Sequence, residues 1–529
     1  MGSGPRPLIA ARVMPGCRPR RILTRGLAPA YIRLAMRGRL FLETFGCQMN
    51  VLDSQLVAGR LRACGFEIVD DPDSADVILY NTCSVRDHAE QKVWSRLGEL
   101  QDARKRRPHL VIGVIGCMAE RQGTAMFHKY PHVDLLCGPA ELDKLPAMVC
   151  NALATRLADP AAALRQTALA GPRAGRNAAV PWGDSDALET LDLSRSVVRG
   201  DDAARAYVRV TRGCNKFCSY CIVPYTRGPE VHRPPANIIA EVRKLADGGA
   251  LEITLLGQTV NHYFWKEPDG RAVRFADLLY MIHEAVPSVR RLRFVTSYPR
   301  DFGEDVLAVM RDCPRICRYL HLPAQSGSDR MLRLMRRGYT AAQYVELIDR
   351  AREMLPDVSI ASDFIAGFPG ETEDDHRLSM DLIRRCRFKN SFIFKYSPRP
   401  GTAAAREYPD DVPVEVKRRR NNELLAVQQE VALELNRAMV GQTVEVMVEG
   451  PSPVGARRSA ADAADDAPAA AAAPWRPGKE ICQLSGRTRG DQIVCFDGDP
   501  SLAGRIVNVA IIEVSPLALR GRLVGGDGV

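Results

Sequence analysis

The sequence predicts an α/β protein built from a parallel-sheet α/β domain, a central partial (β/α)6 barrel and a small C-terminal β-barrel. Strand-length apolar segments alternate with amphipathic helical segments from residue 39 to about residue 438, which is typical of parallel sheets covered by helices. Alternating valines, such as Val444, Val446 and Val448, then mark a different kind of strand in the tail. The length of 529 residues suits about three domains.

The composition is that of a globular protein, with 46% hydrophobic and 26% charged residues. No apolar run approaches the ~20 residues that span a bilayer. The net charge of +10 is weak evidence for nucleic-acid binding, because most of it lies at the N-terminus. Residues 1–42 hold nine arginines and no acid, so residues 43–529 carry about +1. RNA contacts would therefore have to come from local basic patches, each of which is alternatively a solvated helix face: residues 104–107, 333–337 and 417–420.

Residues 1–38 carry Pro, Gly and Arg without periodicity and are predicted to be a disordered extension. An Arg-rich, acid-free start also describes a mitochondrial transit peptide. Alternatively, Met36 is the real start of the protein. We expect a chain that begins at Met36 to keep full activity.

The first folded domain is predicted at residues 39–153, where strand candidates alternate with amphipathic stretches such as 54–64 and 86–104. This alternation favours a parallel sheet with helices on its faces. Residues 154–199, rich in Ala, Arg and Gly, are predicted to be a linker. The strand candidates are Leu40–Phe45, Val77–Tyr80, Leu110–Ile115 and Val133–Cys137.

The central domain is predicted at residues 200–436 as a partial barrel of six βα units. Helix starts are indicated by Pro235 in a first turn and by the capping box Thr340-x-x-Gln343. In such barrels the chemistry lies at the carboxyl ends of the strands. The predicted strands are Tyr207–Thr211, Glu252–Leu256, Leu292–Thr296, Tyr319–Leu322, Ser359–Phe364 and Phe392–Lys395.

The tail, residues 437–525, is predicted to form the small β-barrel. Residues 451–478 interrupt it and are rich in Ala and Pro, so they are predicted to be a disordered insertion.

The strongest chemical signal is the spacing of Cys214, Cys218 and Cys221, C-x3-C-x2-C, just after the first barrel strand. A tight loop can turn three thiolates toward one centre, and a [4Fe–4S] cluster normally takes four thiolates. Three would leave one iron open, as catalytic metal sites keep a free position. The alternative is structural zinc with a fourth ligand such as His232.

A second set of cysteines follows three predicted strands of the first domain. Cys47, Cys83 and Cys117 each come after a strand, and carboxyl ends of parallel strands meet at one sheet edge. These cysteines could therefore hold a second cluster. The alternatives are three unrelated buried thiols and Cys137, which also ends a strand, as a rival ligand.

The C-x3-C-x-aromatic-C pattern resembles the radical S-adenosylmethionine (SAM) superfamily. Within it, the chain resembles the methylthiotransferases over about 39–525, apart from the linker and the insertion. The Gly-Cys-Gln-Met-Asn sequence at 46–50 is most similar to the MiaB-type branch. The other segments that carry the resemblance are 81–86, 116–120, 221–228, 254–258, 321–328, 363–371 and 485–488.

The resemblance implies two [4Fe–4S] clusters and SAM as cofactors. Cys214, Cys218 and Cys221 would bind the cluster that cleaves SAM to a radical, and Cys47, Cys83 and Cys117 the auxiliary cluster that carries the methylated sulfur. No side chain is assigned as an acid or base. The expected SAM pocket contains Tyr220, Gln258, Gln325 and Asp363.

The resemblance also implies the reaction: methylthiolation of C2 of N6-isopentenyladenosine at position 37 of tRNA, beside the anticodon. The expected partners are tRNA, an external electron donor of flavodoxin or ferredoxin type and a sulfur donor. The protein is expected to be a cytoplasmic monomer that does not associate with a membrane. The tail resembles a TRAM domain, whose Arg487, Arg489 and Arg505 could contact phosphate or form a solvated surface. The alternatives are a ribosomal protein or another modified tRNA adenosine as substrate, and an iron–sulfur electron carrier without SAM.

Overall fold

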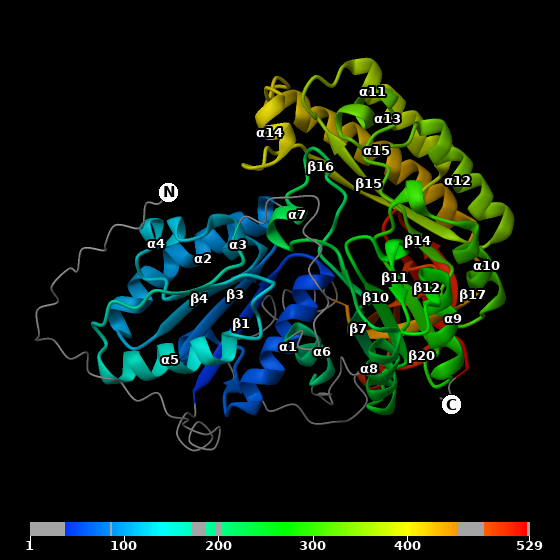
Figure 1. Ribbon diagram of the computed structural model, residues 1–529. Coiled ribbons are helices and arrows are strands. Elements are labelled where there is room, and N and C mark those ends of the chain that lie inside the picture. Colours follow the sequence, from blue (N-terminus) through cyan, green and yellow to red (C-terminus); the bar gives the residue numbers. More distant parts are fainter. Residues whose placement is uncertain (1–37, 85–86, 172–186, 196–203, 453–480, 526–529) are drawn as a thin grey trace, which may run out of the picture.

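The computed structural model describes residues 38–84, 87–171, 187–195, 204–452 and 481–525. Figure 1 shows an N-terminal α/β domain on one side of the molecule and an open barrel with a small C-terminal barrel on the other. The predicted N-terminal extension, save residue 38, and the predicted insertion, save residues 451 and 452, lie outside the described residues. No helix in the described ranges is long and apolar enough to cross a membrane.

The N-terminal domain contains a parallel sheet with the strand order β2-β1-β3-β4-β5-β6. Its central strands β3 (Val77–Thr82) and β4 (Val111–Gly116) are buried along their whole length, as expected when apolar cores cover both faces. The other elements are β1 (Arg39–Phe45), β2 (Glu67–Ile68), β5 (Leu135–Cys137), α1 (Gln48–Ala63), α2 (Asp87–Arg106), α3 (Cys117–Gln122), α4 (Ala125–Lys129) and α5 (Leu145–Ala158).

The segment predicted as a linker is partly structured. Strand β6 (Gln166–Ala168) pairs in parallel with β5 and extends the sheet. Helix α6 (Ala187–Leu193) buries Leu191 and Asp192 next to the central domain. The segment 154–199, predicted to be a linker, therefore contains these two elements.

The central domain is the predicted partial barrel. Its strands form two parallel halves, β13-β10-β7 and β14-β15-β16, joined where Cys317 N donates to Leu292 O at 2.8 Å. The strands are β7 (Arg205–Arg209), β10 (Glu252–Leu256), β13 (Arg291–Phe294), β14 (Tyr319–His321), β15 (Ser359–Ala366) and β16 (Asn390–Lys395), with short pairs β8 (Thr211–Arg212) with β9 (Val231–His232) and β11 (Phe264–Lys266) with β12 (Ala272–Arg274).

Helices cover the outside of this barrel and pack on one large apolar core. The predicted start signals are confirmed: α8 begins at Pro235, and Thr340 and Gln343 form the capping box of α12. The helices are α7 (Val223–Thr226), α8 (Pro235–Asp247), α9 (Phe275–Ala285), α10 (Glu304–Asp312), α11 (Asp329–Leu334), α12 (Ala341–Met354), α13 (Glu373–Cys386), α14 (Ala403–Glu407) and α15 (Val414–Arg437).

The C-terminal domain is a closed barrel in the order β17-β18-β19-β21-β20, which confirms the third part of the predicted fold class. Alternating residues such as Val446, Val448 and Val509 point into its core. Its strands are β17 (Thr443–Pro451), β18 (Cys482–Thr488), β19 (Ile493–Gly498), β20 (Ile506–Val514) and β21 (Leu519–Leu523).

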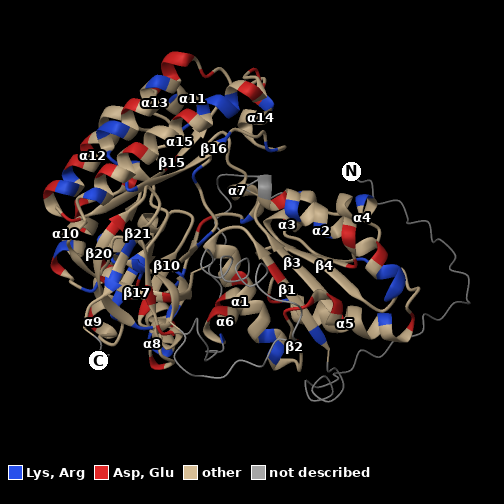
Figure 2. Cartoon of the chain, turned by 180° about the vertical axis from the view of Figure 1, so that it is seen from behind, with Lys and Arg blue, Asp and Glu red and all other residues tan. Residues whose placement is uncertain are grey.

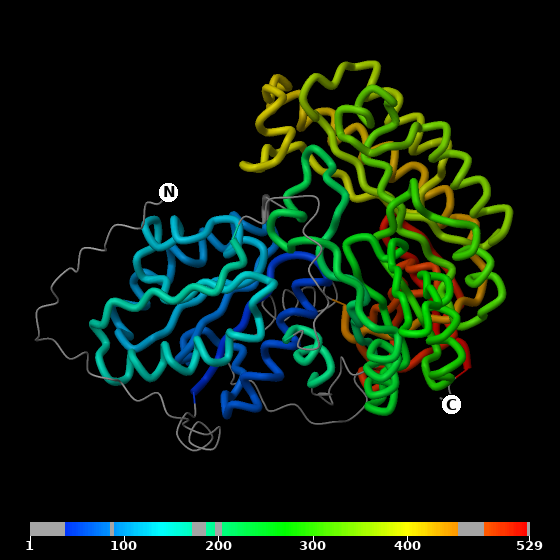
Figure 3. Tube along the Cα trace, viewed as in Figure 1, coloured from blue at the N-terminus to red at the C-terminus, as the bar shows by residue number. Residues whose placement is uncertain are grey.

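This small barrel is docked against the amino ends of the central strands, where the red tube meets the green one in Figure 3. The buried Arg291 side chain bonds Glu445 Oε1 at 2.8 Å. Arg293 donates to Thr488 O at 3.1 Å, and Lys389 pairs with Asp491 at 2.9 Å. The C-terminal barrel thus closes the end of the central barrel opposite to the strand ends where chemistry is expected.

Candidate functional site

Cys47, Cys83 and Cys117 come together at one edge of the N-terminal sheet. They follow β1, β3 and β4, which are adjacent strands. A hydrogen bond with Cys83 lowers the pKa of the Cys47 thiol to about 5, against the opposing effect of burial. Burial raises the pKa of Cys117, whose thiol also interacts electrostatically with Cys47. Three thiols from distant parts of the sequence therefore lie near one another at this sheet edge, where they interact electrostatically.

Glycine and asparagine residues beside these cysteines make the close approach feasible. Gly116 has φ +87°, and a Cβ there would lie 2.4 Å from Asn81 Oδ1. Asn50 Nδ2 donates to Asn81 Oδ1 at 3.0 Å, and Asn81 Nδ2 donates back to Asn50 O at 2.9 Å. This buried pair joins the first turn of α1 to the end of β3. Both asparagines lie within sequence segments named above, 46–50 and 81–86, but the sequence did not indicate that they pair.

Cys137, the rival ligand, lies at the end of β5. Its side chain is fully buried and its thiol donates to Glu141 O at 3.2 Å. Burial, reinforced by Glu141, raises its pKa. It is therefore a thiol held by backbone carbonyls, and its described partners do not include the three cysteines above.

Cys214, Cys218 and Cys221 lie on the loop between β8 and β9. The loop is fixed by Cys221 N, which donates to Cys218 O at 3.0 Å, and by Ser219 Oγ, which donates to Leu334 O at 2.7 Å. Burial raises the pKa of Cys214 to about 12 and that of Cys221 further, and the neighbouring thiols add to both shifts. Thiolates on one short loop are suited to share positively charged iron.

One buried guanidinium, Arg337, touches this second group of thiols. Its Nη1 donates to Cys218 Sγ at 3.4 Å, and its Nη2 donates to Pro323 O at 2.9 Å. The residue was seen in the sequence as part of a basic patch. The structure shows that it is turned inward, so it is not part of an RNA-facing surface.

The zinc alternative gains no support from His232. Its ring packs edge to face against Tyr263, and its Nε2 lies 3.7 Å from Glu230. Across the described ranges, no group of three or more His, Cys, Asp or Glu side chains is arranged around a position for a single metal ion.

A cavity of about 480 Å³ lies inside the central barrel and reaches all three domains. Cys47 and Cys83 lie in its wall, together with carboxyl-end residues such as Gly257 and Thr296. The C-terminal barrel supplies further wall residues to the same cavity, namely Glu449, Arg487 and Asp491.

The four predicted SAM-pocket residues separate into two pairs. Gln258 and Asp363 line the cavity, and His321 Nε2 lies 2.9 Å from Asp363 Oδ1. Tyr220 instead packs edge to face on Phe368, with ring centroids 6.5 Å apart. Gln325 is buried with φ +74°, and its backbone pairs with β15. These last two lie outside the cavity wall.

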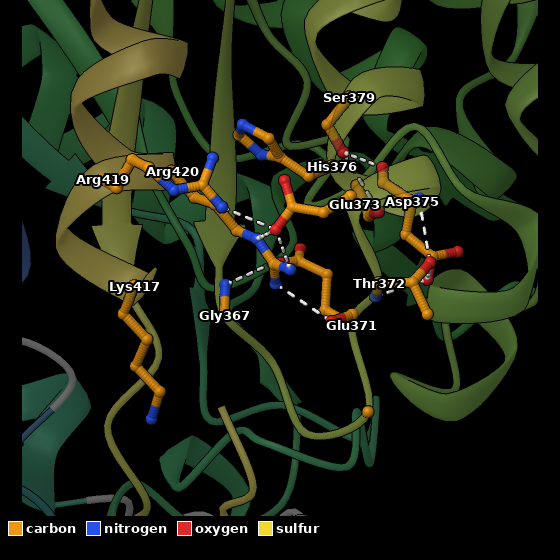
Figure 4. Close-up of polar contacts among 12 residues, drawn as sticks. Gly367, Glu371, Thr372, Glu373, Asp375, His376, Ser379, Lys417, Arg419 and Arg420 are labelled. Atoms are coloured by element: carbon orange, nitrogen blue, oxygen red, sulfur yellow. Dashed lines mark hydrogen bonds and ion pairs between the residues drawn. The ribbon is translucent and has the colours of Figure 1, made fainter. Parts of the chain in front are cut away.

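Two arginines of the 417–420 patch, Arg419 and Arg420, form ion pairs with acidic residues of the facing turn and helix, as Figure 4 shows for Arg420. Arg420 bonds Glu371 Oε2 at 2.9 Å and Glu373 Oε1 at 2.7 Å. Glu371 also accepts from Gly367 N at 2.7 Å, and burial raises its pKa to about 6. Lys417 pairs with Asp410. Arg420 therefore fixes the Gly-Phe-Pro-Gly-Glu turn against α15, whereas Arg418 of the same patch is exposed.

Most other basic side chains singled out in the sequence are also paired, and acidic and basic residues intermingle on the helices in Figure 2. Arg104 binds Asp134 through two hydrogen bonds. Arg487 pairs with Glu449 and Asp491, and Arg489 donates to Pro314 O and Ile316 O. The Arg487 side chain is thus paired within the C-terminal barrel and Arg489 is bonded to the central domain, and phosphate contact by these two residues stays a prediction. Arg505 is exposed.

Comparison with known proteins agrees with this architecture. Residues 208–383 match the radical SAM superfamily, and residues 39–138 match the uncharacterized protein family UPF0004. Together with the thiols on the barrel loop, this defines an enzyme of the radical SAM class. The chain belongs to the family of tRNA-2-methylthio-N(6)-dimethylallyladenosine synthases, as its relatives show.

The relative from Rhodopirellula baltica is 45% identical over 93% of this chain and 96% of its own. The relative from Syntrophotalea carbinolica is 40% identical over 89% and 96%, respectively. Both carry the synthase name above. Among solved structures, the radical SAM methyltransferase TsrM from Kitasatospora setae aligns with a TM-score of 0.45 and 15% identity, over 70% of this chain and 75% of that one.

Proposed function

We propose that this enzyme methylthiolates C2 of N6-isopentenyladenosine at position 37 of tRNA. The observation that carries the proposal is the barrel cavity, whose wall includes Cys47 and Cys83 of the N-terminal domain. A carrier of sulfur on those cysteines would lie inside the same space as a substrate held by the barrel. The family membership supplies the substrate class.

The two groups of thiols fit the two clusters that the family requires. Each group offers three thiol donors, one fewer than a [4Fe–4S] cluster normally takes, so each cluster would keep one iron open. Cys214, Cys218 and Cys221 would hold the cluster that binds SAM. Cys47, Cys83 and Cys117 would hold the auxiliary cluster. When bound, the clusters and SAM supply the radical chemistry and the sulfur transfer.

The chain itself supplies binding, orientation and exclusion of water. The side chain of Phe392 on β16 is 44% exposed and lines the cavity, so it offers an aromatic face for an adenine that has left its stack. Asp363 and Gln258 provide hydrogen-bonding groups on the same wall. The C-terminal barrel closes the cavity at the amino ends of the central strands and keeps solvent from entering there.

The partners follow from the reaction. The enzyme takes electrons from an external donor of flavodoxin or ferredoxin type, receives sulfur from a donor and acts as a monomer in the cytoplasm. The nearest alternative substrates are a ribosomal protein and a different modified tRNA adenosine, which would use the same clusters and cavity.

The test is an anaerobic assay with both clusters loaded, SAM, dithionite and tRNA that carries N6-isopentenyladenosine. Mass spectrometry of digested nucleosides should show the methylthio product, and 5′-deoxyadenosine should form. The Cys218→Ala variant should form neither. Product on ribosomal protein but not on tRNA would overturn the proposed substrate, and release of no 5′-deoxyadenosine would overturn the reaction class.

A further inference from the structure

A buried carboxylate joins the N-terminal domain to the central barrel. Asp53 on α1 is fully buried; its Oδ1 accepts from Arg209 and its Oδ2 from Arg227, both at 3.0 Å. Arg209 also binds Asp192 of α6 at 2.6 Å. The two arginines thus share Asp53, and Arg209 has Asp192 as a second carboxylate partner.

Arg227 reaches the thiols of the N-terminal domain. It follows α7, six residues after Cys221, and α7 packs against α3, which begins with Cys117. Figure 1 shows α7 between α3 and the barrel strands. The Arg227 side chain is 7% exposed, and its positive charge opposes the rise that burial causes in the pKa of the Cys117 thiol. The loop that carries one group of thiols therefore delivers a cation to the other group.

The groups that interact electrostatically with Arg227 are Asp53 and the thiols of Cys117, Cys47 and Cys83. A guanidinium stays charged at any pH that the protein survives, and its planar fork can donate to two partners at once. In a buried site the interaction between charges is much stronger than in water. The arrangement places one permanent positive charge beside three thiols that would carry negative charge as ligands.

We propose that Arg227 is a positioning residue of the auxiliary cluster, which donates a hydrogen bond to a ligand thiolate and stabilises the reduced form of the cluster. The inference rests on the proposed function, which assigns that cluster to Cys47, Cys83 and Cys117. Reduction adds a negative charge, so a neighbouring cation and hydrogen bonds to sulfur raise the reduction potential. Asp53 holds the guanidinium in place through its ion pair with Arg227.

The test isolates the auxiliary cluster in the full chain by replacing Cys214, Cys218 and Cys221 with Ala. The anaerobically loaded protein is titrated with dithionite and monitored by electron paramagnetic resonance. Arg227→Met should lower the ratio of reduced to oxidised cluster about tenfold at a fixed potential, a shift of about 59 mV for one electron. Arg227→Lys keeps the charge but cannot reach Asp53 and a thiolate together, so it should give a smaller shift.

The matched control is Arg104→Met. Buried Asp134 is also shared by two arginines, Arg104 at 2.8 Å and Arg156 at 2.5 Å, so this change costs a comparable buried ion pair without touching a thiol. Its potential should equal that of the parent. An equal shift in Arg104→Met, or an unshifted potential in iron-loaded Arg227→Met, would overturn the proposal.

The iron content separates the remaining outcomes. If Arg227→Met loses its cluster while Arg104→Met retains it, the positioning role is supported, and Arg227→Lys decides the electronic role: a lowered potential supports it and an unchanged one overturns it. If the parent with Cys47, Cys83 and Cys117 intact takes up no cluster, the proposed function fails and not this inference alone.

Discussion

Gly213 illustrates how much of the site depends on single residues. It precedes the first cysteine of the barrel loop and has φ +67°, and a Cβ there would lie 2.0 Å from Pro229 O and 2.4 Å from Gly228 O. The loop can fold back over Gly228 and Pro229 because no side chain intervenes. Cys214 N then donates to Gly228 O at 3.1 Å.

Gly213→Ala should therefore displace the barrel loop and cost the enzyme its SAM-binding cluster. Both the left-handed φ and a clash with backbone oxygens, which cannot move aside as a side chain can, oppose the methyl group. Iron should fall from about eight to about four per chain, given two [4Fe–4S] clusters. Gly249→Ala is the control, because φ is +105° there but nothing lies within 4 Å of the added Cβ. Full iron in Gly213→Ala would contradict this account.

The ligand set of the N-terminal domain makes a second residue-scale prediction. The triple variant Cys47→Ala, Cys83→Ala, Cys117→Ala should hold about four irons, not eight, because one of two [4Fe–4S] clusters is lost. It should still cleave SAM but transfer no sulfur to tRNA. Cys137→Ala should behave as wild type, since its thiol bonds the Glu141 carbonyl. Loss of half the iron in Cys137→Ala instead would show that the ligands are chosen wrongly.

The grouping of the cysteines could be predicted from the sequence, but the charged residues around them could not. Cysteine spacing and position after a strand are local signals, and parallel pairing turns them into a spatial prediction. The contact between Arg227 and Asp53 joins residues 174 positions apart, and no periodicity reports such a pair. The inward turn of Arg337 is likewise set by packing, so its sequence neighbourhood suggested only a basic patch.

At the scale of elements, strands with continuous apolar runs were predictable. The expected Glu252–Leu256 has the observed bounds, and Val77–Tyr80 is two residues short of β3. Strand β6 was missed because its three residues, Gln166–Ala168, are too few for a period to appear and follow an Ala-rich stretch. Its pairing with β5 supplies the stability that its own sequence lacks.

The docking of the C-terminal barrel through β13 and β17 gives an element-scale prediction. Arg291 is fully buried and bonds Glu445 and two carbonyls, Glu445 O and Arg487 O, both at 2.9 Å. Arg291→Leu removes one donor from each of these acceptors, which should cost about 2–4 kcal/mol. The thermal unfolding midpoint should fall, and protease should cut faster between α15 and β17.

Arg520→Leu is the control for Arg291→Leu. It removes an exposed partner of Glu513 at 3.7 Å on the same small barrel, and such pairs contribute roughly 0–1 kcal/mol. Comparable losses in the two variants would mean that Arg291 does not hold the barrel in place.

At the scale of the whole molecule, the cavity is a shared product of the three domains. The N-terminal domain contributes Cys47 and Cys83, the central barrel most of the wall, and the C-terminal barrel Glu449, Arg487 and Asp491. The three domains were predicted separately from their own patterns. The contribution of the C-terminal barrel to that cavity was not predicted, because Arg487 reaches the wall only after the domains have packed.

The shared cavity leads to a prediction about substrate binding. Phe392 projects from β16 with its ring edge-on to His321, at a centroid distance of 6.1 Å, and remains 44% exposed in the cavity. Stacking of a base on an aromatic side chain contributes about 1–3 kcal/mol.

Phe392→Ala should therefore lower kcat/KM for methylthiolation about tenfold or more, since 1.4 kcal/mol is a factor of ten. Iron content should stay at the wild-type level, because Phe392 is not one of the six cysteine ligands proposed for the clusters. Phe264→Ala, which removes a ring of similar exposure (48%) from a different pocket, should leave the rate unchanged. Kinetics with tRNA, read by nucleoside mass spectrometry, compare the two variants, and equal rates would place the target base elsewhere than against β16.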